Sequence, residues 1–158
     1  MKQLIVNADD FGYSKGINKG VLHAYKQGIV TSTSLMVNSV YAQDAVKIVK
    51  KEPLLGIGLH FVWRDDDNMI RRNIIHQLSR FTLKKVEEEL IKQIRLFSGL
   101  VGKPPDHLNS HHHFHTLPHI FPIFRKHALQ YQIPIRSDKI KVIKIVNKMA
   151  IRVPTILI

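Results

Sequence analysis

The 158-residue sequence contains no cysteine and a single tryptophan. Without cysteine the chain can form neither a disulfide framework nor a thiolate metal site, and a reducing compartment is the expected setting. No apolar run approaches the roughly 18 residues that a membrane-spanning helix needs, and the first residues lack the layout of a signal peptide. The sequence therefore predicts a cytoplasmic protein that does not enter a membrane.

Acidic residues are scarce beside basic ones, 12 against 24, and the formal net charge is +12. Such a balance indicates either a polyanionic partner such as nucleic acid or a solvated basic surface. Basic residues are spread along the chain, and those near the C-terminus are not interleaved with aromatic residues. We favour the solvated surface and expect no nucleic-acid partner. A basic polyanion-binding module is kept as a less favoured alternative.

Short apolar runs alternate with segments of helical periodicity, an order that predicts an α/β fold. Expected strands are 4–6, 29–38, 55–62, 106–110 and 133–136, and expected helices are 14–27, 41–51, 82–98 and one that begins at Pro118. Residues 63–79 lack either pattern and are predicted to form a long loop. Alternation of this kind indicates a mainly parallel sheet with right-handed crossovers.

The first expected strand runs directly into two adjacent carboxylates, Asp9 and Asp10. Neighbouring carboxylates repel each other, and burial raises their pKa, so the pair is costly unless a cation lies beside it. A solvated Asp-Asp turn is the simpler alternative for the pair taken alone.

Histidines lie near or just after the ends of two later expected strands. His60 lies near the end of 55–62, and His111 follows 106–110. Because parallel strands present their carboxyl ends at one edge, both imidazoles are expected beside the Asp pair. One carboxylate and two imidazoles form a ligand set that leaves positions open for water and substrate. For His60 alone, a hydrogen-bonded core histidine is the alternative.

Six histidines fall within 13 residues: His107, His111, His112, His113, His115 and His119. One ion cannot bind all of them, so some should orient others or contact a substrate. In an extended segment alternate residues face the same way, which predicts that His111, His113 and His115 point together into the site.

Several of these motifs together resemble one known family. The blocks NADDFG at 7–12, GLHF at 58–61 and HLNSHHHFH at 107–115, together with GIVTST at 28–33 and Arg136, are similar to the YdjC-like carbohydrate deacetylases. The resemblance implies a distorted β/α barrel of the NodB-deacetylase type and one divalent cation, Mg²⁺ or Zn²⁺. Carried onto this chain, it implies Asp10, His60 and His111 as metal ligands and Asp9 as the catalytic base.

The implied activity is removal of acetyl groups from N-acetylated sugars or chitooligosaccharides. A metal can polarise an amide carbonyl and lower the pKa of a bound water, and Asp9 would accept the proton from that water. His113 and His115 are candidates for orienting the acetyl group or donating a proton, and Arg136 for keeping Asp9 ionised. Trp63 offers an aromatic face to a sugar ring.

The chain departs from this family in two ways. Asn109 stands where an aspartate is expected, and residues 137–158 form a Lys/Ile-rich tail that resembles nothing in it. We therefore predict a deacetylase-like domain over 1–136, a separate tail, and a barrel that lacks its last strands. An open barrel exposes a strand edge, which favours a homo-oligomer, most simply a dimer. A truncated metal-binding remnant with little or no activity is the alternative to an active enzyme.

Overall fold

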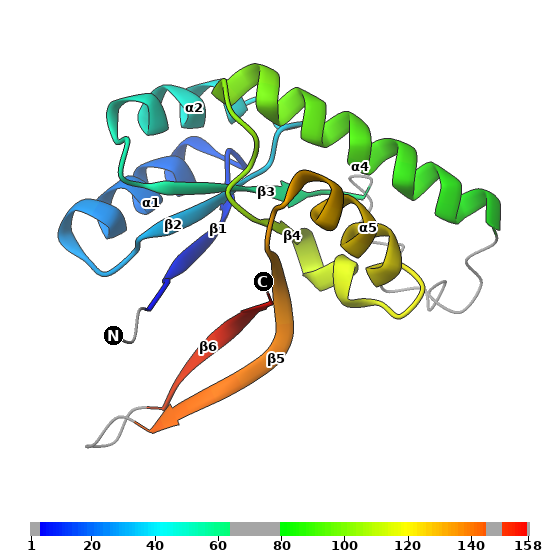
Figure 1. The fold of residues 1–158 in the computed structure, drawn as a ribbon. Coiled ribbons are helices and arrows are strands. Elements are labelled where there is room, and N and C mark those ends of the chain that lie inside the picture. The colour runs from blue at the N-terminus through cyan, green and yellow to red at the C-terminus, as the bar shows by residue number, and fades with distance from the viewer. Residues whose placement is uncertain (1–3, 64–79, 145–149, 158) are drawn as a thin grey trace.

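The computed structural model describes residues 4–63, 80–144 and 150–157, and these form an open α/β sheet (Figure 1). Its elements are β1 (Asn7–Phe11), α1 (Lys15–Gln27), β2 (Ser32–Leu35), α2 (Ala42–Lys51), β3 (Gly56–Phe61), α4 (Arg80–Val101), β4 (Leu108–Ser110), a 3₁₀ segment η2 (His111–Thr116), α5 (Phe121–Tyr131), β5 (Ile135–Lys144) and β6 (Ala150–Leu157). The loop expected at 63–79 lies outside the described residues from 64 onward.

The strands follow one another across the sheet in the order in which they occur in the chain, from β1 to β6. The first five are parallel, and β6 returns antiparallel to β5. Sequential parallel strands separated by helices form the wall of a β/α barrel. Among the described strands β1 and β6 have one neighbour each, so this wall is open. The predicted α/β fold with mainly parallel strands is confirmed.

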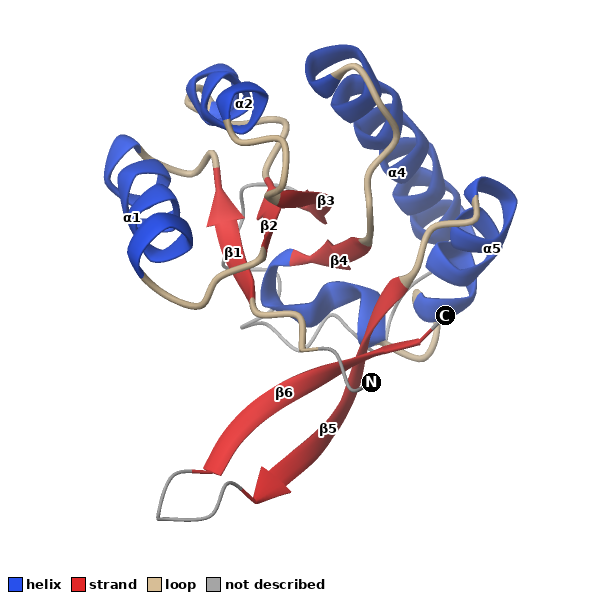
Figure 2. Cartoon of the chain, turned by 60° about the vertical axis from the view of Figure 1, so that its left-hand side comes forward, coloured by secondary structure: helices blue, strands red, loops and turns tan. Residues whose placement is uncertain are grey.

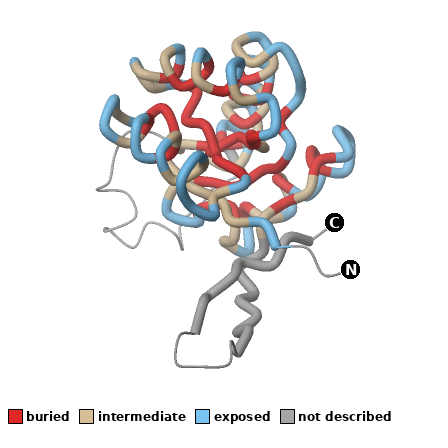
Figure 3. The backbone as a smooth tube through the Cα atoms, turned by 90° about the vertical axis from the view of Figure 1, so that its left-hand side faces the viewer, coloured by how far each residue is buried: buried red, intermediate tan, exposed pale blue. Residues whose placement is uncertain are grey.

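The described helices α1, α2, α4 and α5 lie in an arc on the outer side of the strands (Figure 2). Within this arc α1 contacts α2, α2 contacts α4, and α4 contacts α5. Most of β2, β3 and β4 and the inward parts of the helices are buried, and the outward sides of the helices are exposed (Figure 3). This arrangement covers one face of the sheet and leaves the carboxyl ends of the strands available for a site.

Local sequence explains why these elements form. The side chain of Ser14 accepts a hydrogen bond from the backbone N–H of Ile17 and caps α1 at its start. In α4, residues at helical spacing are turned inward, and Val86, Leu90 and Phe97 are fully buried. They pack with the apolar residues of the strands in one core cluster, which includes Phe11, Leu35, Ile57, Leu59, Phe61 and Leu108.

The first strand begins later than its apolar residues suggest. Leu4 and Ile5 are each 50% exposed, and β1 spans Asn7–Phe11. The expected strand at 4–6 is therefore wrong in position, since the ladder needs backbone partners, and these begin with Val6, which pairs with Thr31. The Asp pair consequently lies inside β1 rather than after it.

The chain after Arg136 continues β5 to Lys144 and returns as β6, forming a two-stranded hairpin that projects from the sheet (Figure 1). The expected strand ended at Arg136, so β5 is longer than predicted, and the division into 1–136 and 137–158 stays a prediction. None of the helices in the part of the chain that the structure describes is both long and apolar enough to span a bilayer.

Candidate metal centre

An irregularity in β1 presents both aspartates to one side of the sheet. The pairing of β1 with β2 changes register between Ala8 and Phe11, and Asp10 has a φ of 62°. In a regular strand consecutive side chains alternate between the two faces, so Asp9 and Asp10 would be separated. The bulge and the left-handed residue instead let both carboxylates approach His60. A left-handed non-glycine residue costs about 1 kcal/mol or more, which is typical of a functional position.

Gly12 completes this turn with a φ of 93°, where a side chain would be strained. Its N–H donates to Asn18 Oδ1 at 2.7 Å, and the Asn18 side chain also donates to the carbonyl of Tyr41. Asn18 is 2% exposed and, with Val21, is one of the buried residues of α1. Its buried amide therefore fixes the turn that positions the two aspartates.

Asp10, His60 and His111 bring three potential ligand atoms together. Asp10 Oδ1 lies 3.0 Å from His60 Nε2 and 3.1 Å from His111 Nδ1, and the three atoms all lie within 4.8 Å of one another. The side chain of His60 is 3% exposed and that of Asp10 is 36% exposed, so the cluster is buried on the His60 side and open to solvent on the Asp10 side. A carboxylate oxygen and two imidazole nitrogens at this spacing fit a divalent cation with free positions on the open side.

The hydrogen bonds of Asn109 decide which nitrogen of His60 is available. A carboxylate can only accept, so the Asn109 atom 2.9 Å from Asp9 Oδ1 is the donor Nδ2. Its Oδ1 then accepts from His60 Nδ1 at 2.7 Å. With the proton on Nδ1, the lone pair of Nε2 faces the Asp10 oxygen, a repulsive contact that a bound cation would relieve. Asn109 thus supplies the bond by which a metal-binding histidine is usually oriented.

The ionisation of the other two donors also suits a cation. The close contact with the His60 imidazole lowers the pKa of Asp10, against burial, which alone raises it, and the neighbouring His111 imidazole lowers it further. Burial and the neighbouring His112 lower the pKa of His111. Asp10 is therefore an anion and His111 a neutral imidazole at neutral pH, the forms that bind metals.

Asp9 lies beside the cluster but is held by other partners. Its Oδ2 accepts from Arg136 Nη1 at 2.5 Å, and its Oδ1 accepts from Asn7 and Asn109 at 2.8 and 2.9 Å. Burial alone raises the pKa of Asp9, but the charges of His60 and Arg136 and the hydrogen bonds from Arg136 and Asn109 bring it below the usual value. Asp9 is thus an oriented, ionised carboxylate next to the three donors and outside their set.

Further buried polar groups form hydrogen bonds with the residues that orient Asp9 and His60. Ser34 Oγ accepts from Asn7 and Asn109 at 2.8 and 2.9 Å and pairs with His107 Nε2 at 2.9 Å. The His107 ring lies against the backbone of Gly58, where an added Cβ would come within 2.4 Å of the ring. Ser34, His107 and Asn109 are each at most 8% exposed. The glycine therefore makes room for the imidazole on which the network rests.

The histidine cluster does not have the extended shape expected for it. Residues His111–Thr116 form the 3₁₀ segment η2, and His112 and His113 both have left-handed backbone angles of φ 52° and 55°. The prediction that His111, His113 and His115 point together is therefore wrong, because a 3₁₀ turn replaces the alternation of a strand. His111 reaches Asp10, whereas the ring of His112 lies against that of His111 at 3.8 Å between centroids.

His113 and His115 have different surroundings. His113 is exposed, and burial together with the charge of Arg136 lowers its pKa, while the charge of Asp9 raises it, so it lies within electrostatic range of the site. His115 is fully buried, and its Nδ1 pairs with Ser110 Oγ at 2.6 Å while its Nε2 lies 2.9 Å from the carbonyl oxygen of Arg136. His115 therefore fixes the backbone of Arg136 and is not turned to the open side.

Trp63 follows β3 and lies outside the metal cluster. Its ring stacks on Phe114 at 6.1 Å between centroids with an angle of 11°, and Phe114 in turn stacks on Phe61. Phe61 and Phe114 belong to the buried core. Trp63, which the sequence suggested for a sugar contact, also lines a surface pocket.

We predict a loss of stability in mild acid because of two buried histidines. Burial lowers the pKa of His107 and of His115 to about 4, against 6.5 for an ordinary histidine. Between these values the unfolded chain binds protons that the folded chain does not, so the free energy of unfolding should fall as the pH drops from about 6.5 to about 4. Each histidine contributes a loss on the order of 3 kcal/mol over that range.

Urea unfolding at several pH values, with a chelator present so that metal release does not contribute, measures this effect. His107→Gln should remove the part of the pH dependence that His107 contributes, about half of the share of the two buried histidines, whereas His23→Gln, on the exposed side of α1, should leave it unchanged. A free energy of unfolding that is constant between pH 7 and pH 4.5 would contradict the assignment.

Sequence reasoning missed several residues that form hydrogen bonds around the site. Asn7 lies within one of the family motifs, Ser34 follows another, and Asn18 lies in a helix. Nothing in the sequence around each residue indicates that its side chain belongs to a buried hydrogen-bond network. The one usable sign is a polar residue in a fully buried strand, as Ser34 is in β2. A buried polar group requires partners, which indicates a network rather than core packing.

The strand order and the cluster at the carboxyl ends of β1, β3 and β4 agree with the family suggested by the sequence motifs. The chain belongs to the YdjC-like protein family, whose model matches residues 3–155.

Its relatives carry more specific descriptions. The chain is 39% identical over 152 residues to a chitooligosaccharide deacetylase of Serratia marcescens, covering 87% of this chain and 60% of that protein. It is 40% identical over 147 residues to a carbohydrate deacetylase of Brevibacillus brevis, covering 85% and 58%.

A solved structure shows the same fold. This is a protein of Enterococcus faecalis described as a putative cellobiose-phosphate cleavage protein, with a TM-score of 0.74 and 29% identity over 86% of this chain and 59% of that one. The chain thus spans about three fifths of the length of each of these relatives.

Proposed function

We propose that this chain is a metal-dependent hydrolase that removes acetyl groups from N-acetylated sugars or chitooligosaccharides. The observation that carries the proposal is the pairing of a three-donor cluster with a separate, ionised carboxylate, Asp9. The descriptions of the relatives from Serratia and Brevibacillus as deacetylases support the substrate class.

Asp10, His60 and His111 would hold one divalent cation. Two imidazole nitrogens favour Zn²⁺ or another transition ion over Mg²⁺, which prefers oxygen ligands, although the supply of each ion in the cell also decides occupancy. When bound, the cation would polarise the amide carbonyl and lower the pKa of water at the site.

The residues around the cluster would transfer the proton and position the group that accepts it. Asp9 accepts a proton from the attacking water, whose oxygen bonds to the acetyl carbon. The carbon–nitrogen bond then breaks, and protonation of the nitrogen gives acetate and a free amino sugar. Arg136 and Asn109 keep Asp9 ionised and oriented, and His115 holds the backbone of Arg136. The predicted dimer and the cytoplasmic location stay predictions.

Metal analysis of the purified chain, combined with acetate release from N,N'-diacetylchitobiose, tests this function. We expect one equivalent of metal per chain, acetate release with that metal, and loss of the release after chelation. Stoichiometric metal without acetate release would instead support a metal-binding protein without turnover. A chain that binds no metal and releases no acetate would contradict both.

A further inference from the structure

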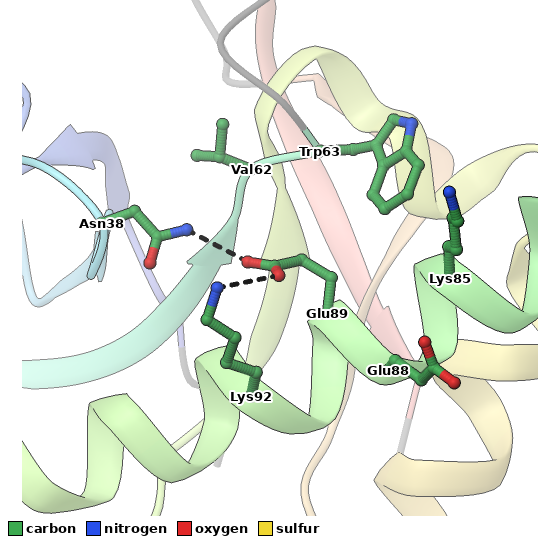
Figure 4. Close-up of a pocket in the computed structure, with 7 residues that line it drawn as sticks. All are labelled: Asn38, Val62, Trp63, Lys85, Glu88, Glu89 and Lys92. Carbon is green, nitrogen blue, oxygen red and sulfur yellow. Dashed lines mark hydrogen bonds and ion pairs between the residues drawn. The ribbon is translucent and has the colours of Figure 1, made fainter.

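A pocket of about 430 Å³ lies between the chain segments that follow β2 and β3 and the helix α4 (Figure 4). Asn38, Val62 and Trp63 line it from the strand side, and charged residues of α4, among them Glu89 and Lys92, line it from the helix side. This volume falls within the range of about 300 to 1,000 Å³ that is usual for small-molecule sites.

Two residues that line the pocket lie close, along the chain or by ring stacking, to the histidines of the candidate metal centre. Val62 and Trp63 directly follow β3, which carries His60 two residues before Val62. The Trp63 ring stacks on Phe114, three residues after His111. The pocket wall thus begins two residues after His60, and its Trp63 touches the segment that begins with His111. This closeness along the chain makes the pocket a candidate for the part of a longer sugar that extends beyond the three donors.

The polar side of the pocket is held in place by hydrogen bonds. Glu89 accepts from Asn38 Nδ2 at 3.3 Å, from Gln93 Nε2 at 2.9 Å and from Lys92 Nζ at 3.2 Å. Gln93 is fully buried and bonds to both the N–H and the carbonyl of Val62, at 3.1 and 2.8 Å. The carboxylate of Glu89 is thus fixed relative to the end of β3.

This combination of groups suits a pyranose ring. Such a ring has an apolar face of C–H groups, which an indole plane contacts, and a rim of hydroxyl groups that donate and accept hydrogen bonds. Glu89 offers fixed acceptors, and Asn38 and Lys92 offer donors around the same space. A charged surface without an aromatic wall would lack the first of these contacts.

We propose that this pocket binds the sugar unit adjoining the one that loses its acetyl group. The proposal rests on the proposed function for the identity of the chain of sugars, but its test does not depend on turnover. Trp63 is the single tryptophan of the sequence. Its fluorescence therefore reports occupancy of the pocket without interference from any other indole.

The experiment titrates the protein with N-acetylglucosamine and with N,N'-diacetylchitobiose while tryptophan emission is recorded. Asp9→Asn protein is used in parallel so that the sugars stay intact. We expect a saturable change in emission with the disaccharide, at concentrations about tenfold lower than with the monosaccharide, because only the longer sugar fills both positions. Unchanged emission with the disaccharide would overturn the proposal, whether or not acetate is released.

Two substitutions on the same helix separate the pocket from a general charge effect. Glu89→Gln should weaken disaccharide binding about tenfold, since a hydrogen bond to a charged acceptor becomes one to a neutral acceptor. Glu87→Gln removes the same charge from α4, but Glu87 pairs with Lys126 and His127 on α5, so binding should be unchanged. Equal affinities in both variants would contradict the assignment of Glu89.

The proposed function and the pocket can fail separately in this design. Acetate release with unchanged Trp63 emission would keep the deacetylase and overturn the pocket. Saturable emission without acetate release would support the pocket and contradict the deacetylase. Circular dichroism of each variant shows that its fold is retained before binding is compared.

Discussion

Replacing Asp10 by alanine is expected to abolish metal binding, whereas replacing its neighbour Asp9 by asparagine should leave the metal in place and remove the activity. Asp10 Oδ1 is the atom that both His60 and His111 face. Without it, two imidazoles remain, and the affinity should fall about a thousandfold or more because a charged ligand is lost. Asp9 faces Arg136, Asn7 and Asn109 instead.

The amide that Asp9→Asn introduces keeps one acceptor oxygen for these neighbours, loses the other, and is a far weaker base. We expect turnover to fall about 10²- to 10⁴-fold, the usual contribution of a general base. Calorimetric titration with Zn²⁺ measures binding, and acetate release measures turnover. Each variant serves as the control for the other because the substitutions are adjacent. Equal loss of metal in both would show that the two roles are assigned wrongly.

Replacing Gly58 by alanine should cause the largest loss of stability among single small substitutions near the site. The added Cβ would come within 2.4 Å of the buried His107 ring, a distance that requires the ring to move. Movement breaks its hydrogen bond to Ser34, on which Asn7 and Asn109 also converge. We expect a loss of at least about 3 kcal/mol from steric strain and an unsatisfied buried group.

Thermal unfolding checks this expectation, with a decrease in Tm of roughly 10 °C for a domain of this size. Gly99→Ala is the matched control, because Gly99 lies in α4 and a Cβ there meets no atom within 4 Å. An alanine inside a helix should stabilise the protein by about 0.5 to 1 kcal/mol. A Gly58→Ala protein that melts with the wild type would mean that His107 does not depend on this close approach.

The arrangement of the site could be predicted because it follows from strand order. Asp10, His60 and His111 are far apart in the sequence, yet each stands at or near the carboxyl end of a strand, and parallel strands place those ends at one edge. Periodicity also predicted the helices α1, α2 and α4 to within a few residues. The family resemblance supplied the division of roles between Asp9 and Asp10.

Features that depend on backbone irregularity were not predictable from pattern. The bulge at Asp9 and Asp10 and the left-handed His112 and His113 break the two-residue period on which the alternation argument rests. Tertiary contacts decide these angles, because each costs free energy that only the finished structure offsets. The same holds for Asn18, whose buried amide fixes a turn in a neighbouring segment.

The contact between Arg136 and Asp9 joins residues 127 positions apart, from the first strand of the sheet to the fifth. Contacts of such long sequence separation close large loops and belong to the slow part of folding, after the local helices have formed. The proposed metal donors Asp10, His60 and His111 come from β1, β3 and the start of η2, whereas the full set of hydrogen-bond donors around Asp9 also requires β5. A refolding chain should thus regain metal affinity before it regains an ionised and oriented base.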